Sequence, residues 1–129
     1  MDYAYEKLDV WKKAVDFTIE IISTVTNEPE AIKHPRIAQA LEGSSMTIAT
    51  AIAEGKAFAS GREFTQHLFI SRGSVYKTMT LLEILRRKKI IPDEKYADLD
   101  AAAQHLTAML SALIKSISGQ KSDNAKHAS

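Results

Sequence analysis

The sequence predicts an all-α protein, an antiparallel up-down-up-down four-helix bundle, and three observations lead to this fold class. Apolar residues recur at spacings of three and four in four separate segments, which is the period of one helix face. No segment alternates apolar and polar residues as a strand does, and no internal repeat of solenoid length is present. The connections between the segments are short, and short connections make successive helices antiparallel neighbours.

The overall composition indicates one globular domain in a reducing compartment. The chain has 129 residues, of which 45% are hydrophobic and 26% are charged, and it contains no cysteine. No apolar run approaches the roughly 18 residues that span a bilayer, and no apolar segment follows the N-terminus as in a signal peptide. We therefore expect a cytoplasmic protein with no membrane partner. A net charge of +1 means that any nucleic-acid partner must be bound by a local basic patch.

The first helix is predicted over residues 9–26. Asp9 is a candidate N-cap, because a short acidic side chain can accept hydrogen bonds from the first free backbone amides. The helix should end before Pro29, since proline disfavours the helical conformation in the residue that precedes it. Residues 28–35, which begin and end near prolines, are expected to form the first loop.

The second helix is predicted over residues 36–58, and its inner face becomes unusually small toward its end. Alanines and Gly55 dominate there, which would let a neighbouring helix approach closely. Ser60 and Glu63 then have the spacing of a capping box, in which the serine hydroxyl accepts a hydrogen bond from the Glu63 amide. This motif places the start of the third helix, which is expected over residues 61–89.

The third helix carries two apolar stripes, and one bundle core cannot cover both of them. The main stripe faces the predicted core, whereas Phe69 and Tyr76 belong to a second stripe off to the side. Self-association is the simplest way to cover this second surface. We therefore predict that Phe69 and Tyr76 lie in an oligomer interface.

The fourth helix is predicted over residues 93–118, with Pro92 and two acidic residues at its start. Its apolar positions alternate strictly between spacings of three and four, as shallow-angle bundle packing requires. Gly119 should end the helix. The predicted organisation is thus a single bundle over residues 1–118 followed by a flexible C-terminal tail over residues 119–129.

Basic residues are the candidate nucleic-acid-binding groups. Four consecutive cations end the third helix, and two more lie near the start of the first. The alternative interpretation is a solvated helix end, where cations complement the helix dipole without binding any ligand. The six candidates are Arg86, Arg87, Lys88, Lys89, Lys12 and Lys13.

No combination of residues predicts an enzyme. Glu54 has no second carboxylate or nucleophile at a useful spacing, and Ser71 and Ser74 do not lie in a nucleophile elbow. His67 and His105 lie on different helices, but the paired Glu-x-x-His motifs of a dimetal bundle are missing. Glycine-rich phosphate-binding loops are missing as well. We expect no catalytic residues, no metal site and no cofactor.

Four short motifs resemble a known family. They fall in the family's order without obvious gaps, and the resemblance covers roughly residues 6–118. The motifs are Leu8-Asp9-Val10-Trp11-Lys12-Lys13-Ala14, Ile52-Ala53-Glu54-Gly55, Ser60 followed by Glu63-Phe64, and Arg72-Gly73-Ser74. With these motifs the sequence is similar to the four-helix-bundle proteins encoded in intervening sequences of bacterial 23S ribosomal RNA genes, a family that includes the accessory protein of diversity-generating retroelements.

The resemblance implies a bundle that assembles into a ring-like homopentamer. For the retroelement member it also implies a basic surface that binds nucleic acid and a reverse transcriptase. Within this pattern, the structural-motif residues are Glu54, Gly55, Gly73 and Ser74. The sequence departs from the family where charge matters, because a usual pair of basic residues is replaced by Glu42-Gly43 and a usual loop arginine by Phe58.

Two functional hypotheses follow from these observations. The first is a non-enzymatic, ring-forming binding or adaptor protein that contacts RNA or DNA through its basic residues. The second is a protein-protein interaction scaffold or regulator without nucleic-acid binding, in which the basic residues only solubilise the surface. The replacements Glu42, Gly43 and Phe58 favour the second hypothesis, and an exposed Phe58 could anchor a protein partner.

Overall fold

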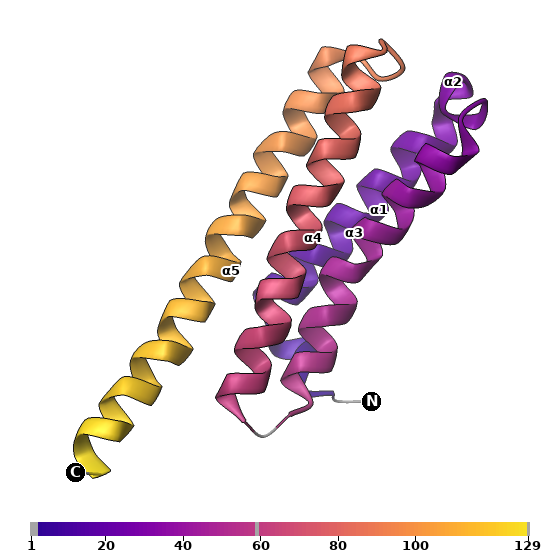
Figure 1. Cartoon of the computed structure of the whole chain (residues 1–129). Helices are drawn as coiled ribbons and strands as arrows, with labels where there is room; N and C mark the ends of the chain where they lie inside the picture. Colours follow the sequence, from indigo (N-terminus) through magenta and orange to yellow (C-terminus); the bar gives the residue numbers. More distant parts are fainter. Residues whose placement is uncertain (1–2, 59, 129) are drawn as a thin grey trace.

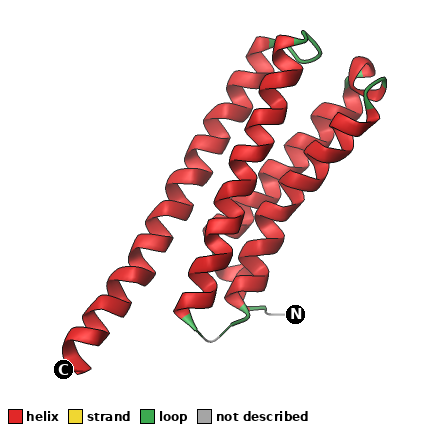
Figure 2. Cartoon of the chain, viewed as in Figure 1, coloured by secondary structure: helices red, strands yellow, loops and turns green. Residues whose placement is uncertain are grey.

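Four long helices make up most of the chain, and together they form the predicted all-α bundle (Figure 1). The structure is a computed structural model that describes the backbone of residues 3–58 and 60–128, with side chains as far as Gly119. Loops occur only at the connections between helices, and no strand is found in this part of the chain (Figure 2). The helices are η1 (Ala4–Lys7, a 3-10 turn), α1 (Asp9–Asn27), α2 (Pro29–Ile32), α3 (Pro35–Lys56), α4 (Gly61–Arg87) and α5 (Asp93–Ala128).

The four long helices are arranged so that each contacts two others. α1 packs on α3 and α5, and α4 also packs on α3 and α5, so that α1 lies diagonally across from α4. The pair α1/α3 therefore forms one side of the bundle and the pair α4/α5 forms the opposite side (Figure 1). Within the described chain, none of the helices combines the length and apolar character needed to cross a lipid bilayer.

The core confirms the apolar stripes expected from the sequence. Each long helix contributes side chains at spacings of three and four, and these side chains are almost fully removed from solvent. Burial of such large aliphatic groups is the main force that stabilises the bundle. The largest fully buried apolar side chains are Ile21, Leu41, Ile48, Ile52, Leu68, Leu82, Leu85, Leu106, Leu110 and Val75.

A seam of buried hydroxyl groups runs between α1, α3 and α4. The Thr18 hydroxyl donates to the Ser45 carbonyl oxygen at 2.8 Å, which joins α1 to α3. The Ser71 hydroxyl donates to the Ile48 carbonyl oxygen at 2.8 Å, which joins α4 to α3. The Ser71 hydroxyl therefore bonds across the α3–α4 interface. Because a buried polar group without a partner is costly, these bonds favour one register of the helices.

Gly55 confirms the prediction that small residues allow α3 and α4 to approach closely. A Cβ atom added at Gly55 would lie 2.5 Å from the Cβ of His67, well inside van der Waals contact. Gly73, which belongs to another of the family motifs, is different, because a Cβ there would meet nothing within 4 Å. Gly55 is therefore required by packing inside this chain, whereas Gly73 is not.

At the starts of the first three α-helices the structure differs from the sequence prediction, and two of these helices begin at prolines. Asp9 is the first helical residue, and Leu8 is the N-cap, without a side-chain cap bond. The predicted loop 28–35 contains the single-turn helix α2, which starts at Pro29, and α3 starts at Pro35. Proline fits the first helical position because its fixed φ is helical and its missing N–H has no intrahelical acceptor there.

The later boundaries also differ. α3 ends at Lys56, two residues before the predicted end, and α4 ends at Arg87, also two residues early. The predicted cap of α4 is present, since the Ser60 hydroxyl accepts a hydrogen bond from the Glu63 amide at 3.4 Å.

At the C-terminus the predicted tail over 119–129 begins as helix. α5 continues through Gly119 to Ala128, and its last part projects beyond the other helices (Figure 1). A glycine inside a helix costs only about 1 kcal/mol relative to alanine, so Gly119 alone does not end α5.

Two glycine substitutions in α3 should change stability in opposite directions. Gly55→Ala should lower the free energy of unfolding by about 1–3 kcal/mol, because the new methyl group must push α4 away at His67. The matched control Gly43→Ala has open space around its Cβ and should raise stability by about 0.5–1 kcal/mol through better helix propensity. Urea unfolding monitored by circular dichroism measures the free energy of unfolding of both variants. An equal change in this free energy for the two variants would contradict the close approach at Gly55.

Candidate nucleic-acid interface

The basic residues at the end of α4 lie on a tight turn with a defined backbone conformation. Lys89 has a positive φ of 59°, in the left-handed region. The Ile90 amide donates to the Leu85 carbonyl oxygen at 2.9 Å, and the Lys89 amide donates to the Arg86 carbonyl oxygen at 2.9 Å. This pair of bonds is a Schellman motif, and the accompanying apolar contact is present because Leu85 and Ile90 are both buried. The turn that carries the cations is therefore anchored in the core.

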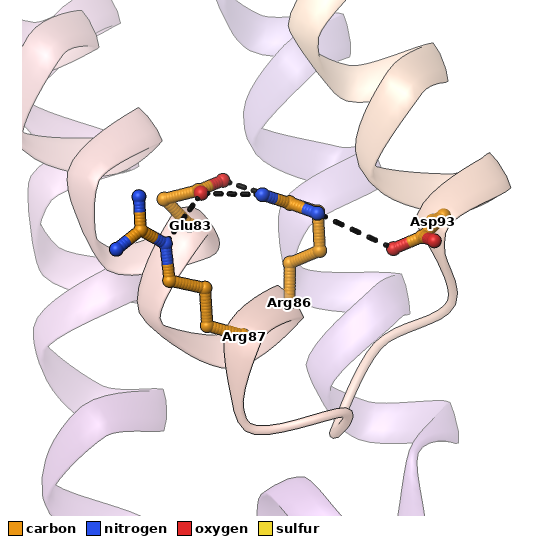
Figure 3. Close-up of polar contacts among 4 residues, drawn as sticks. All are labelled: Glu83, Arg86, Arg87 and Asp93. Atoms are coloured by element: carbon orange, nitrogen blue, oxygen red, sulfur yellow. Dashed lines mark hydrogen bonds and ion pairs between the residues drawn. The ribbon is translucent and has the colours of Figure 1, made fainter.

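Two arginines of this turn share one carboxylate (Figure 3). Arg86 bonds both oxygens of Glu83, with its Nε 2.8 Å from Oε2, while the Arg87 Nε donates to Oε1 at 2.9 Å. Arg86 also reaches Asp93 at the start of α5, with 3.6 Å between Nη1 and Oδ1. Its guanidinium lies 5.2 Å from the ring centre of Tyr96. Arg86 therefore ties α4 to α5 and is part of the fold.

The ion pairs hold these groups in their charged forms. Hydrogen bonds from Arg86 and Arg87 lower the pKa of the Glu83 carboxyl to about 2, so it is ionised at any physiological pH. The hydrogen bond between Arg86 and Glu83 raises the pKa of the Arg86 guanidinium above its usual value. Burial raises the pKa of the Tyr96 phenol, and the nearby Glu83 and Asp100 carboxylates add to this shift.

We call the charged residues of this region the turn cluster: Glu83, Arg86, Arg87, Lys88, Lys89 and Asp93. Four cations and two carboxylates give it a formal charge of +2. The Arg87 side chain is 77% exposed and the Arg86 side chain 33% exposed, while both lysines are exposed. An open depression of about 570 Å³ adjoins the cluster; it is lined by Glu28, Arg86, Arg87, Lys89, Ile90, Ile91, Pro92 and Asp93.

The structure separates the six predicted nucleic-acid-binding residues into two groups. Lys12 and Lys13 are exposed in the first turn of α1. That end of α1 lies at the opposite end of the bundle from the α4–α5 turn (Figure 1). α4 has 27 residues and is therefore about 40 Å long, so the two groups cannot bind the same phosphate.

The remaining candidate residues do not assemble into a site. Glu54 is exposed, and its carboxylate forms no ion pair within the described chain. Ser74 is half-buried and accepts a bond from the Thr78 hydroxyl at its carbonyl oxygen. The His67 Nδ1 lies 2.8 Å from the Glu63 carbonyl oxygen. Among the residues described, no three His, Asp or Glu side chains form a group able to hold a metal.

Two exposed apolar faces lie on opposite sides of the bundle. Phe69 and Tyr76 of α4 are 47% and 54% exposed, as expected, and Tyr76 borders an apolar depression of about 390 Å³ between α4 and α5. On the α1/α3 side, Ile19, Ile22 and Met46 are also exposed. Ile22 is one turn from Thr18, and Met46 is next to Ser45, so both flank the bond that joins α1 to α3.

Sequence reasoning missed the apolar face on the α1/α3 side and the ion pairs that Glu83 and Asp93 form in the turn cluster. The signal for Glu83 was present, because a glutamate three and four residues before two arginines is placed to pair with both on one helix face. The exposure of Ile19 could not be found in the same way, since apolar residues lie on both sides of the first helix.

The fold and the charged turn define a class of protein: a small helical bundle whose α4–α5 turn carries exposed cations. Residues 6–112 match the family described as 23S rRNA-intervening sequence protein, and the chain belongs to this family. The structure is similar to the crystal structure of a Bacteroides thetaiotaomicron protein of unknown function from the S23 ribosomal protein family. The two chains are 23% identical with a TM-score of 0.77, and the match covers 82% of this chain and 98% of the other. No curated protein matches the chain.

Replacing Glu83 with glutamine should make stability depend less on pH. Because the pKa of Glu83 is lowered in the folded state, its ion pairs stabilise the protein above about pH 4.5, and this contribution is lost as the pH falls toward 2. Glu83→Gln should therefore melt below the wild type at pH 7, and the difference should shrink between pH 5 and pH 2. The groups that face Glu83 are Arg86 and Arg87 of α4 and Tyr96 of α5.

Thermal melts at several pH values measure this effect. The control Glu54→Gln removes a carboxylate that has no ion-pair partner in the described chain. Its melting temperature should show no difference from the wild type that shrinks as the pH is lowered. A melting difference for Glu83→Gln that stays constant from pH 7 to pH 2 would contradict the stabilising role of the Glu83 ion pairs.

Proposed function

We propose that this protein is a non-enzymatic, ring-forming binding module that contacts RNA or DNA through the turn cluster. The observation that carries the proposal is the placement of Arg87, Lys88 and Lys89 as consecutive exposed cations on a turn anchored in the core. Cations held on a rigid turn lose little freedom when they bind phosphate. The description of the family by a ribosomal RNA intervening sequence is consistent with this partner class.

One copy of the turn cluster is a weak site, because its formal charge is only +2. An assembly changes this, since several identical clusters can bind phosphates of the same strand at once. The assembly then binds the strand more tightly than one turn cluster does, and the salt dependence of binding grows with the total number of phosphates contacted. The proposal therefore requires an oligomer, and the resemblance to ring-forming bundles suggests a homopentamer.

The two exposed apolar faces support a head-to-tail ring. Different surfaces on opposite sides of one chain pair heterologously, and heterologous contacts close into rings when the rotation between copies permits. Phe69, Gly73 and Tyr76 follow each other at spacings of four and three, so they form one stripe of α4. A glycine with open space around it lets a neighbouring copy come close to the α4 backbone. A reverse transcriptase or another protein is a further candidate partner, as the family resemblance implies.

The alternative function is a protein-protein interaction scaffold or regulator without nucleic-acid binding. The specific observation in its favour is Phe58, which is exposed in the α3–α4 connection, with its ring centre 5.1 Å from that of the His67 ring and the two rings tilted by 40°. An exposed aromatic ring held by a neighbour is a good anchor for a protein partner.

The nucleic-acid hypothesis predicts a steep salt dependence that two lysine substitutions reduce. The variant Lys88→Ala with Lys89→Gly should bind a single-stranded RNA at least tenfold more weakly at 100 mM salt. The slope of log K against log salt should also become shallower by about 0.7, the value for a single strand, for each phosphate that the variant no longer binds. Glycine suits the left-handed conformation at residue 89, so the variant should remain folded.

Fluorescence anisotropy over a salt series measures this binding. Lys12→Ala with Lys13→Ala is the matched control, since it removes the same charge from the other end of the bundle. Weaker binding confined to the first variant supports a single interface at the turn. Salt-independent or absent binding by the wild type would overturn the nucleic-acid hypothesis and leave the scaffold.

The ring hypothesis predicts that two different single substitutions each abolish assembly. Phe69→Lys on the α4/α5 side and Ile19→Lys on the α1/α3 side should each yield monomers of 14.3 kDa by size-exclusion chromatography with light scattering. Mixing the two variants should yield a dimer, because each retains the face that is disrupted in the other. A wild-type monomer at micromolar concentration, or a mixture that stays monomeric, would contradict the head-to-tail ring.

A further inference from the structure

We propose that Glu83 acts as an internal substitute for phosphate, which holds Arg87 while no nucleic acid is bound and so limits the affinity of the turn cluster. This inference rests on the proposed function and concerns the regulation of the same site. Carboxylate and phosphate both present oxygen anions to a guanidinium, and both accept its N–H groups in similar geometry. Glu83 therefore occupies the bonding position on Arg87 that a phosphate would take.

The two arginines are held very differently. Arg86 has several anchors: both oxygens of Glu83, the carboxylate of Asp93 and the ring of Tyr96. Among the described residues, Arg87 has one polar contact, the hydrogen bond from its Nε to Glu83 at 2.9 Å, and its side chain is 77% exposed. Exposed ion pairs of this kind are weak and exchange readily. Arg87 is therefore the arginine that can exchange its bond to Glu83 for a bond to phosphate, whereas Arg86 keeps its contacts within the fold.

Departure of Arg87 does not leave Glu83 unpaired. Both carboxylate oxygens remain bonded to Arg86, so the exchange exposes no unsatisfied buried group (Figure 3). Arg87 directly precedes Lys88 and Lys89, so a phosphate near the lysines lies within reach of its long side chain. Binding thus replaces the carboxylate partner of Arg87 by a phosphate, and Glu83 subtracts from the affinity by competing for the arginine.

The prediction is that removing the negative charge of Glu83 strengthens binding. Glu83→Gln should bind a single-stranded RNA about three- to tenfold more tightly than the wild type. The slope of log K against log salt should become steeper by about 0.7, as expected on a single strand for one additional bound phosphate per copy that engages the strand. A glutamine can still accept a hydrogen bond from Arg86, which keeps the connection between α4 and α5.

Two further variants separate competition for Arg87 from a general change of charge. Asp93→Asn removes the same charge from the turn cluster but faces Arg86, so it should leave the salt slope unchanged. In an Arg87→Ala background, Glu83→Gln should no longer strengthen binding, because the arginine that it releases is missing. This double-mutant comparison isolates the coupling between the two residues.

Circular dichroism confirms that each variant is folded, and anisotropy over a salt series gives the slopes. Tighter binding by Glu83→Gln that depends on Arg87 and is not reproduced by Asp93→Asn supports the inference. A wild type that binds with salt dependence but is unaffected by Glu83→Gln overturns the inference alone, as does equal strengthening by Asp93→Asn. Absence of salt-dependent binding in both the wild type and Glu83→Gln overturns the proposed function as well.

Discussion

The close approach of α3 and α4 is the constraint on which the rest of the structure depends. Gly55 leaves no room for a side chain against His67, and the Ser71 hydroxyl reaches directly to a carbonyl oxygen of α3. A second bond, between the hydroxyls of Ser44 and Thr78 at 2.8 Å, lies further along the same interface. A slip of one helix by one turn would break both bonds and place a side chain where only glycine fits. The pair is therefore held at a single register.

The position of the turn cluster follows from this register. α4 starts at the Ser60 cap beside the end of α3 and continues to Arg87, so the interface with α3 also determines where its basic end lies. The Schellman motif then reverses the chain into α5, and Arg86 fastens the two sides of the turn through Glu83 and Asp93. The surface charge of this end is thus set by core packing and one ion-pair network, and not by the basic sequence alone.

Much of the fold could be predicted from the sequence, because four apolar stripes with spacings of three and four leave few other architectures. The boundaries were less accurate where one residue type has two roles: Pro29 and Pro35 begin helices, and Gly119 lies inside one. The candidate site was predicted only in part. Counting cations along the chain could not show that Arg86 is engaged in ion pairs within the fold. The position of Glu83, three residues before Arg86, did indicate such a pair.

The arrangement of the apolar faces bears on the proposed ring through geometry. The exposed residues of both faces belong to the long helices α1, α3 and α4, along the sides of the bundle. The α4–α5 turn, which carries the turn cluster, lies at one end, and the start of α1, which carries Lys12 and Lys13, lies at the other (Figure 1). Contacts between sides bring copies together with their helices roughly along the ring axis, so every turn cluster would lie on one rim. Cations repeated around one rim can follow a single strand, whereas cations at the far end meet a different segment. A ring of this kind would therefore turn a weakly basic chain into a continuous basic rim, although its net charge per copy is only +1.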